Sequence, residues 1–238
     1  MERLERDAFL ARATLPTFKR KVEKAKEIIR EALAIAPAYV AVSWGKDSVV
    51  MLHLVQSICP DVLVIHIRTP QQELLENFEE VATKYFSIFP TNYSVVDIGM
   101  EETISHASLS LRLWESYPLS FIGLRAEENQ KTRGQSARKY GYIHKYESGA
   151  KQNSFRCCPL LWWTWQDVWA YICLFDLPYL ASYDNVNNSD KSQSRTTNLM
   201  MFGDKITGSR RYGRIEQLRM LHPEAYQFLQ QYYPEVTR

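Results

Sequence analysis

The segment that most constrains the fold is a short apolar run that leads through a small polar turn into a second apolar run. It reads Tyr39-Val40-Ala41-Val42-Ser43-Trp44-Gly45-Lys46-Asp47-Ser48-Val49-Val50. The pattern predicts a buried strand, a tight turn and a helix, in that order. Such a turn directs unpaired backbone N–H groups and the positive end of the helix at one point. That point is a binding place for an anion, of which phosphate is the usual one.

Strands and helices alternate around this segment. Apolar residues at helical spacing over 17–35 predict a helix that Pro37 ends. We expect strands at 38–42, 63–67, 93–98 and 119–124, with intervening helices at 49–58, 74–86 and 101–114. Polar and basic loops are expected after residue 125, followed by helices at 165–175, 214–221 and 223–232 and a polar loop at 184–200. The alternation predicts an α/β fold, with a parallel sheet covered by helices on both faces.

Composition excludes several classes of protein. The 238 residues are 45% hydrophobic and 24% charged, which is typical of a globular protein and not of a disordered chain. A net charge of +2 gives no general case for nucleic acid or membrane binding. No run approaches the ~20 apolar residues of a membrane helix, and the charged first residues lack the apolar core of a secretory signal. We therefore expect a cytoplasmic protein without membrane contact.

The cysteines indicate no disulfide framework and no zinc site. Cys157 and Cys158 are adjacent, and Cys59 and Cys173 are isolated from them. An iron–sulfur cluster would need about four well-placed thiolates, which is every cysteine here, so none is expected. Cys157 and Cys158 could relay sulfur, although buried inert thiols are the favoured interpretation.

The residues of the turn have the chemistry of a phosphate site. Ser43 and Ser48 supply hydroxyl donors, Lys46 supplies a positive charge, and Gly45 permits close backbone approach. Asp47 would repel phosphate directly, so it is expected to cap the helix or to hold a magnesium ion. The alternative is an ordinary strand–helix turn with a serine cap.

The turn resembles the S-G-G-x-D-S pyrophosphate loop of the adenine nucleotide alpha-hydrolase superfamily, the PP-loop superfamily. Five of the six positions match, and Trp44 stands at the first glycine although tryptophan disfavours positive φ. The Walker pattern does not fit, because the lysine and serine stand in the wrong frame.

Two later segments resemble the phosphoadenylyl-sulfate reductase-like branch of that superfamily. The segment 121–128 reads FIGLRAEE, is followed by Arg133, and resembles its G-[IL]-R-x-x-E-S region. The segment 156–172 reads RCCPLLWWTWQDVWAYI and resembles the C-P-[IL]-x-x-W-x-x-x-D-V-W-x-Y-I stretch shared with FAD synthetase-like proteins. Since ligands bind beyond the carboxyl ends of parallel strands, Arg125 should reach the same crevice as Ser43 and grip a phosphate. Thr164 is the expected N-cap of the helix that follows, with Asp167 in its first turn.

The resemblance covers about residues 38–183 and implies a Rossmann-like, HUP-type twisted parallel sheet. An N-terminal helical segment would occupy 1–37, and a polar loop with a helical C-terminal tail would occupy 184–238. The resemblance implies catalytic roles for Lys46, Asp47 and Arg125, with magnesium on Asp47. The implied nucleotide contacts are Val42, Ser43, Trp44, Gly45, Ser48, His66, Ile67, Gly123, Arg133 and Arg156. His66 is equally compatible with a hydrogen-bonded core histidine.

The resemblance leaves three functions open. Phosphoadenylyl-sulfate reductases use a C-terminal cysteine, whereas no cysteine follows Cys173 in this sequence. The favoured function is therefore an ATP pyrophosphatase that uses ATP and Mg²⁺ to adenylate a phosphate for sulfur incorporation, as in the DNA phosphorothioation systems. A cysteine desulfurase and other DNA-modification subunits are the implied partners, with DNA contacts from Arg210, Arg211 and Arg214. The alternatives are a sulfonucleotide reductase and a non-catalytic nucleotide-binding subunit.

Overall fold

The computed structural model describes residues 1–68, 77–97 and 113–184, together with the single helical positions 219, 223, 226, 227 and 230. Most of the helix expected at 101–114 lies outside these residues, as do the expected loop from 185 on and Arg210, Arg211 and Arg214. The helices expected at 214–221 and 223–232 are represented only by those single positions. None of the described helices is long and apolar enough to cross a membrane.

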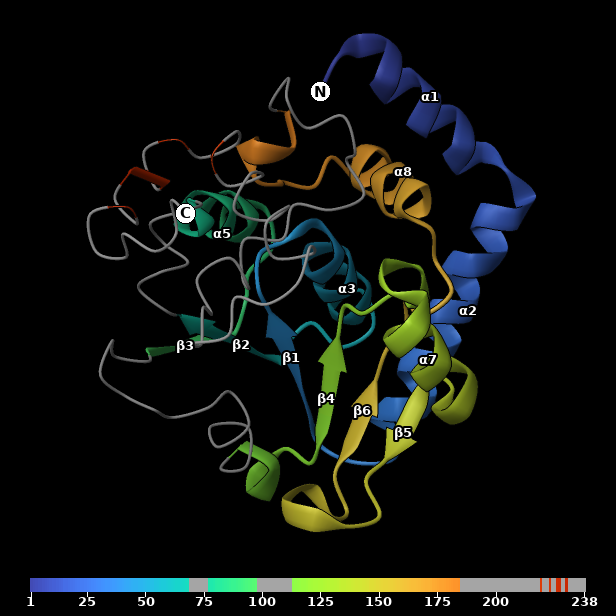
Figure 1. The fold of residues 1–238 in the computed structure, drawn as a ribbon, viewed down its shortest axis with the longest axis vertical. Coiled ribbons are helices and arrows are strands. Elements are labelled where there is room, and N and C mark those ends of the chain that lie inside the picture. The colour runs from blue at the N-terminus through green and yellow to red at the C-terminus, as the bar shows by residue number, and fades with distance from the viewer. Residues whose placement is uncertain are drawn as a thin grey trace.

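A six-stranded sheet forms the centre of the described fold (Figure 1). Its strands are β1 (Ala38–Val42), β2 (Leu63–Arg68), β3 (Tyr93–Asp97), β4 (Leu119–Ile122), β5 (Ile143–Lys145) and β6 (Phe155–Cys157). The spatial order is β3-β2-β1-β4-β6-β5, and every neighbouring pair is parallel except β5 with β6. The predicted α/β class with a parallel sheet is therefore confirmed.

The strand order reverses at β1. The chain runs from β1 to β2 and β3 on one side, and β4 then pairs with the opposite side of β1. Ala41 pairs with Ile122 and Val42 pairs with His66, so the carboxyl ends of β1, β2 and β4 lie at one edge of the sheet. A reversal of this kind opens a crevice between the two strands that diverge from it, here β1 and β4.

Five long helices pack their apolar residues into one hydrophobic core with the sheet. They are α1 (Arg3–Thr14), α2 (Pro16–Leu33), α3 (Lys46–Gln56), α5 (Phe78–Ile88) and α8 (Trp165–Phe175). The apolar spacing predicted α2 and α8 closely. The apolar spacing gave no bounds for α1, which lies within the helical segment expected at 1–37 and has only two buried residues, Phe9 and Ala13. Contact with α8 accounts for its position, because the Phe9 ring stacks on Trp169 with 6.1 Å between centroids.

The region after residue 125 contains regular structure where the sequence predicted only loops. It comprises short helices at Ala126–Glu128, Gln130–Gly134, Gly149–Lys151 and Ala181–Asp184, the helix α7 (Gln135–Tyr140), and the strands β5 and β6. Each of these two strands has three residues, which is too short for an alternation of apolar and polar residues to be recognised. Pairing with β4 fixes their positions instead: Phe121 lies opposite Cys157 and Ser120 opposite Arg156.

Asp167 ties the N-terminal helices to α8. It forms a capping box with Thr164 at the start of α8, as the sequence predicted for this cap. Its Oδ1 accepts a hydrogen bond from Arg12 Nε at 2.9 Å, and its Oδ2 accepts one from Lys21 Nζ at 2.5 Å. Burial alone would raise the pKa of Asp167, but the hydrogen bonds from Lys21, the Thr164 amide and Arg12 together lower it.

We predict that Asp167→Asn lowers the free energy of unfolding at neutral pH by about 2 kcal/mol, because charged hydrogen bonds to a buried carboxylate are lost. A lowered folded-state pKa gives stability that is present above the unfolded-state pKa and is lost as the pH falls through the folded-state value. The deficit of the variant should therefore shrink below about pH 4, as measured by urea unfolding at several pH values. Asp176→Asn is the matched control. The Asp176 side chain is 83% exposed, so its ion pair with Arg6 should contribute at most about 0.5 kcal/mol to the free energy of unfolding. Equal losses in both variants would contradict the assignment.

Candidate functional site

The turn between β1 and α3 is built around an aromatic residue in a left-handed conformation. Trp44 has φ 55°, whereas Gly45, the N-cap of α3, has φ −68°. The Trp44 ring is fully buried, and its Nε1 donates a hydrogen bond to the Tyr93 hydroxyl at 3.2 Å. It also packs against the rings of Tyr85 and Phe86, at 5.9 and 5.4 Å between centroids. Aromatic burial thus holds the backbone conformation that tryptophan otherwise disfavours.

This geometry corrects one predicted contact and reassigns another. The side chain of Trp44 points into the core between α5 and β3, so only its backbone could contact a bound nucleotide. Gly45 is not needed for the conformation of the turn, since its φ is one that any residue adopts. A Cβ at Gly45 would lie 3.7 Å from Ser43 Oγ, which is an ordinary contact. The role of Gly45 is to leave open space in front of the first turn of α3.

Two serine hydroxyls close this turn. Ser48 Oγ donates to the Gly45 carbonyl oxygen at 2.9 Å and accepts from the Ser43 amide at 3.2 Å. The Ser43 hydroxyl lies 3.4 Å from Ser48 Oγ. The structure thus brings together the two hydroxyls that the sequence assigned to a phosphate site, beside the positive end of α3.

Asp47 joins the two cations of the site. Its Oδ2 pairs with Lys46 Nζ at 2.7 Å and its Oδ1 with Arg125 Nε at 2.5 Å. Lys46 and Arg125 are each 1% exposed. Burial alone would raise the pKa of Asp47, but the charges of Lys46 and Arg125 lower it, so the carboxylate stays ionised. Arg125, from the end of β4, therefore meets the first turn of α3, as predicted from the edge that both strands share.

The predicted magnesium site on Asp47 does not fit this arrangement. A magnesium ligand needs a carboxylate oxygen aimed at the ion, and both oxygens of Asp47 already face cationic side chains. Glu127, the next carboxylate in the site, accepts from Arg125 Nη1 at 2.6 Å and from the Trp165 amide at 2.8 Å. Among the described residues no group of three potential ligands forms a metal site. Asp47 instead positions Lys46 and Arg125.

Glu127 is a site residue to which the sequence motifs gave no role. By bonding both Arg125 and the first turn of α8, it fixes the second edge of the guanidinium. The sequence could have indicated this role, because an acidic side chain two residues after an arginine can form an ion pair with it.

Gly123 is required by the close approach of two backbones. A Cβ there would lie 2.8 Å from the Asp47 carbonyl oxygen, 2.9 Å from its carbonyl carbon and 3.0 Å from the Ser48 nitrogen. Only hydrogen fits between β4 and the first turn of α3. The role of Gly123 is thus to let the two halves of the site meet.

His66 and Val42 lie at the site but bond to one another. The Nδ1 of His66 donates to the Val42 carbonyl oxygen at 2.9 Å, and the ring is buried beside Phe78. This geometry matches a hydrogen-bonded core histidine and links the carboxyl ends of β1 and β2. Ile67 follows in β2 and is partly buried.

The structure gives neighbours to two further arginines that the resemblance assigned to the nucleotide. Arg133 lies in the short helix Gln130–Gly134 and pairs with Glu128, and its contact with a nucleotide stays a prediction. Arg156 lies opposite Ser120 in the sheet, before the carboxyl end of β4, and its guanidinium carbon is 5.9 Å from the centroid of the Tyr146 ring. Arg156 therefore faces the β5–β6 hairpin and not the turn after β1. The sequence could not show this, because the register of β6 was unknown.

None of the described cysteines forms a disulfide, and none belongs to the turn between β1 and α3. Burial raises the pKa of Cys157 well above its usual range, and it raises that of Cys158 to about 11. Cys173 is buried in α8. The interpretation of Cys157 and Cys158 as buried, unreactive thiols thus fits better than sulfur relay.

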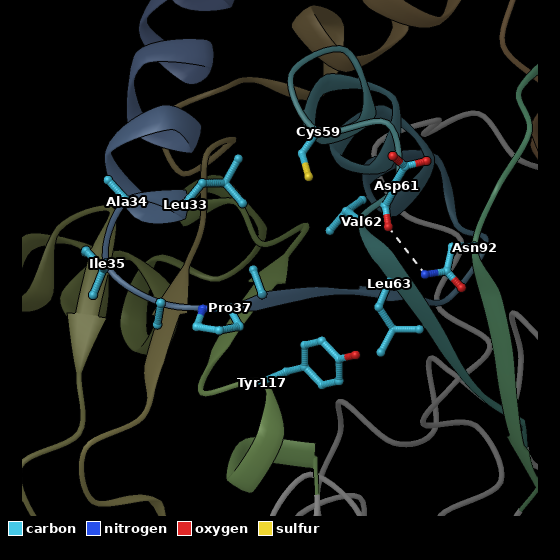
Figure 2. Close-up of a pocket in the computed structure, with 12 residues that line it drawn as sticks. Leu33, Ala34, Ile35, Pro37, Cys59, Asp61, Val62, Leu63, Asn92 and Tyr117 are labelled. Carbon is cyan, nitrogen blue, oxygen red and sulfur yellow. Dashed lines mark hydrogen bonds between the residues drawn. The ribbon is translucent and has the colours of Figure 1, made fainter.

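A cavity of about 610 Å³ lies at the opposite, amino end of β1 and β2 (Figure 2). It is lined mostly by apolar side chains from the end of α2 and the starts of both strands, with Cys59, Asp61, Asn92 and Tyr117 among its polar groups. Asn92 Nδ2 donates to the Asp61 carbonyl oxygen at 3.3 Å across one side. No sequence motif indicated this cavity, and the residues of the β1–α3 turn do not line it.

Comparison with known proteins identifies the relatives of this chain. The phosphoadenosine phosphosulfate reductase domain family matches residues 37–189. The adenosine 5'-phosphosulfate reductase of Bacillus mycoides (strain KBAB4) is 27% identical over 161 residues, which cover 60% of this chain and 66% of that protein, just under two thirds of its length. That of Geobacillus sp. (strain WCH70) is 26% identical over 156 residues, with the same coverage.

Two solved structures share the fold at low sequence identity. The U34-tRNA thiolase NcsA from Methanococcus maripaludis, solved with its [4Fe-4S] cluster, has a TM-score of 0.50 and 15% identity, covering 92% of this chain and 81% of that chain. Yeast FAD synthetase in complex with FAD has a TM-score of 0.51 and 13% identity, covering 93% and 83%. These likenesses confirm the α/β architecture.

We predict that Gly123→Ala lowers the free energy of unfolding by about 1–3 kcal/mol, because the new methyl group forces β4 and α3 apart. Gly45→Ala is the control, since its Cβ makes only an ordinary contact, and its stability should stay within about 0.5 kcal/mol of the parent. Chemical denaturation of both variants measures the difference. Unchanged stability in Gly123→Ala would show that the two backbones do not approach so closely.

Proposed function

The chain belongs to the phosphoadenosine phosphosulfate reductase domain family, and from that premise we propose that its β1–α3 turn binds ATP and supports cleavage between the α and β phosphates. The observation that carries this proposal is the meeting of Lys46, Arg125 and two serine hydroxyls at the strand reversal between β1 and β4. Open α/β sheets bind ligands at such a reversal, and helix N-termini favour phosphates.

The residues at the turn would have two roles, which are binding of the phosphates and stabilisation of the developing charge. The pyrophosphate portion would accept hydrogen bonds from the Ser43 and Ser48 hydroxyls and from the first amides of α3. Lys46 and Arg125 would face the charge that builds on the α-phosphate and on the leaving pyrophosphate. Asp47 and Glu127 hold these cations in place, and Gly123 lets β4 carry Arg125 to the turn.

The proposed reaction is an adenylyl transfer to a phosphate. An oxygen of the acceptor phosphate forms a bond to the α-phosphorus of ATP, the bond from that phosphorus to the bridging oxygen breaks, and pyrophosphate leaves with the electron pair. The outer sulfur of a cysteine desulfurase persulfide would then attack the acceptor phosphorus and displace AMP. A second thiol would cleave the sulfur–sulfur bond, which releases the phosphorothioate and leaves a disulfide between the two thiols. We propose a DNA backbone phosphate as the acceptor, a desulfurase and other DNA-modification subunits as partners, and the cytoplasm as the location.

Sulfonucleotide reduction is the second candidate, because the curated relatives carry that name. The same turn would bind the phosphates of a sulfonucleotide equally well. Reduction, however, needs a reactive thiolate, and the raised pKa values of Cys157 and Cys158 oppose one there. Cys59 lines the cavity at the far end of β1. The described thiols thus favour the ATP reaction. A third candidate is a subunit that binds the nucleotide without turnover. It differs from the ATP pyrophosphatase only in forming no products.

We predict that the protein converts ATP to AMP and pyrophosphate in the presence of magnesium, and that Lys46→Gln slows this at least about 100-fold because leaving-group charge is no longer stabilised. Chromatographic separation of AMP, ADP, pyrophosphate and phosphate measures the products. Lys24→Gln is the matched control, since Lys24 is exposed and pairs only with Glu27 among the described residues. Thermal unfolding checks that both variants fold.

Each other outcome has a definite meaning. ADP with phosphate would contradict the assigned cleavage, and full activity of Lys46→Gln would remove the role of that lysine. ATP binding without turnover would favour the non-catalytic subunit. Thioredoxin-dependent release of sulfite from adenosine 5'-phosphosulfate or phosphoadenylyl sulfate would establish the reductase instead.

A further inference from the structure

A series of rings lies on the β5–β6 hairpin, away from the nucleotide site. Tyr140, His144, Tyr146 and Trp114 contact one another in that order, with centroids 4.1, 4.6 and 6.2 Å apart. Tyr146 and Trp114 are stacked, with 29° between their planes. We call these four residues the hairpin ring series. Tyr140, His144 and Tyr146 come from the continuous segment 140–146, which runs from the end of α7 through β5, and Trp114 comes from the segment before β4, so the fold brings two separate stretches of chain together.

Cationic side chains lie over the same rings. Lys139 Nζ is 4.9 Å from the Tyr140 centroid, and Lys151 Nζ is 4.5 Å from the Trp114 centroid and 5.4 Å from that of Tyr146. The Arg156 guanidinium faces Tyr146 as well, at 5.9 Å.

The cations of this group form no ion pair within the described residues. In the described part of the chain, no carboxylate forms an ion pair with Lys139, Lys151 or Arg156. Two cations therefore share the Tyr146 ring without an acidic partner. Burial and then the charge of Arg156 lower the pKa of Lys151. A bound anion would relieve this repulsion.

The rings also remain accessible. Tyr140 is 39% exposed, and His144, Tyr146, Lys151 and Arg156 are half-buried. Rings that served only the core would be covered, and neither Tyr140 nor Tyr146 belongs to the hydrophobic core. Figure 1 shows the loop between β5 and β6 at the end of the sheet opposite α3, so this surface is separate from the turn at Ser43.

We propose that the hairpin ring series binds single-stranded nucleic acid, with bases stacked on its exposed rings and phosphates paired with Lys151, Arg156 and Lys139. Aromatic faces beside a line of unpaired cations are the chemistry that recognises an unpaired strand. A duplex keeps its base faces covered, and an acidic peptide would use the cations but not the rings. The inference concerns binding alone and does not depend on the reaction at the β1–α3 turn.

The test measures binding of the full chain to a fluorescently labelled oligonucleotide of about 12 nucleotides by anisotropy, with DNA and RNA strands run in parallel. Tyr146→Leu removes the central ring and should weaken binding about ten-fold or more. Tyr146→Phe keeps the ring and should bind like the parent. Lys151→Gln should weaken binding and lower the slope of log affinity against log salt by about 0.7, as for one lost phosphate contact. Lys145→Gln is its matched control, because alternation in β5 places Lys145 on the face opposite His144.

The competitors and the remaining outcomes decide the inference. Unlabelled single strand should displace the probe well below the concentration at which duplex of the same sequence or inorganic polyphosphate does so. If polyphosphate displaced the labelled oligonucleotide equally well, the surface would be a general anion site, and the proposal would be overturned. No binding by the parent, or unchanged binding by Tyr146→Leu when thermal unfolding shows it folded, would overturn it as well. Preference between the DNA and RNA arms identifies which strand is recognised.

Discussion

The ion pair between Asp47 and Arg125 is the contact on which the rest of the site depends. It joins the first turn of α3 to the segment after β4 across the strand reversal, where both side chains are largely withdrawn from water. Removing one partner of a buried pair leaves an uncompensated charge and costs about 3–5 kcal/mol. The pair can form only because Gly123 lets the two backbones touch. Through Glu127 the same arginine is tied to α8, so one guanidinium connects three elements.

Trp44 shows how packing overrides a local preference. A tryptophan at positive φ is unfavourable in isolation, and the sequence motif places glycine there. The structure offsets the strain by enclosing the indole among Tyr85, Phe86 and Tyr93 and by satisfying its N–H. The indole thus holds one side of the turn in the core, while Gly45 leaves the other side of the turn open. The shape of the β1–α3 turn thus depends on residues 40 to 50 positions further along the chain.

The order of elements and the centre of the site could be predicted from sequence because both follow from short-range rules. Alternating apolar runs indicated the parallel sheet, and the shared carboxyl edge of parallel strands placed Arg125 beside Ser43. Directions of side chains could not be predicted where they depend on register. Arg156 is the first residue of a segment that resembles nucleotide-binding relatives, yet pairing of β6 with β4 places it beside Tyr146. Asp47 likewise has a carboxylate of the kind that binds metal ions, but its two oxygens form ion pairs with Lys46 and Arg125.

The register of β4 and β6 also separates the two surfaces that carry proposals. Arg125 follows Ile122 at the carboxyl end of β4, whereas Arg156 lies level with Ser120 and the hairpin loop continues toward the amino end. β4 therefore borders both surfaces: its carboxyl end leads to Arg125, and Ser120, nearer its amino end, lies opposite Arg156. Because a hydrogen-bonded sheet is stiff along its strands, a nucleic acid held on the proposed hairpin surface would keep a fixed spacing from a nucleotide held at the proposed site in the β1–α3 turn. β4 is one element that connects the two surfaces, since its last residues lead directly to Gly123 and Arg125.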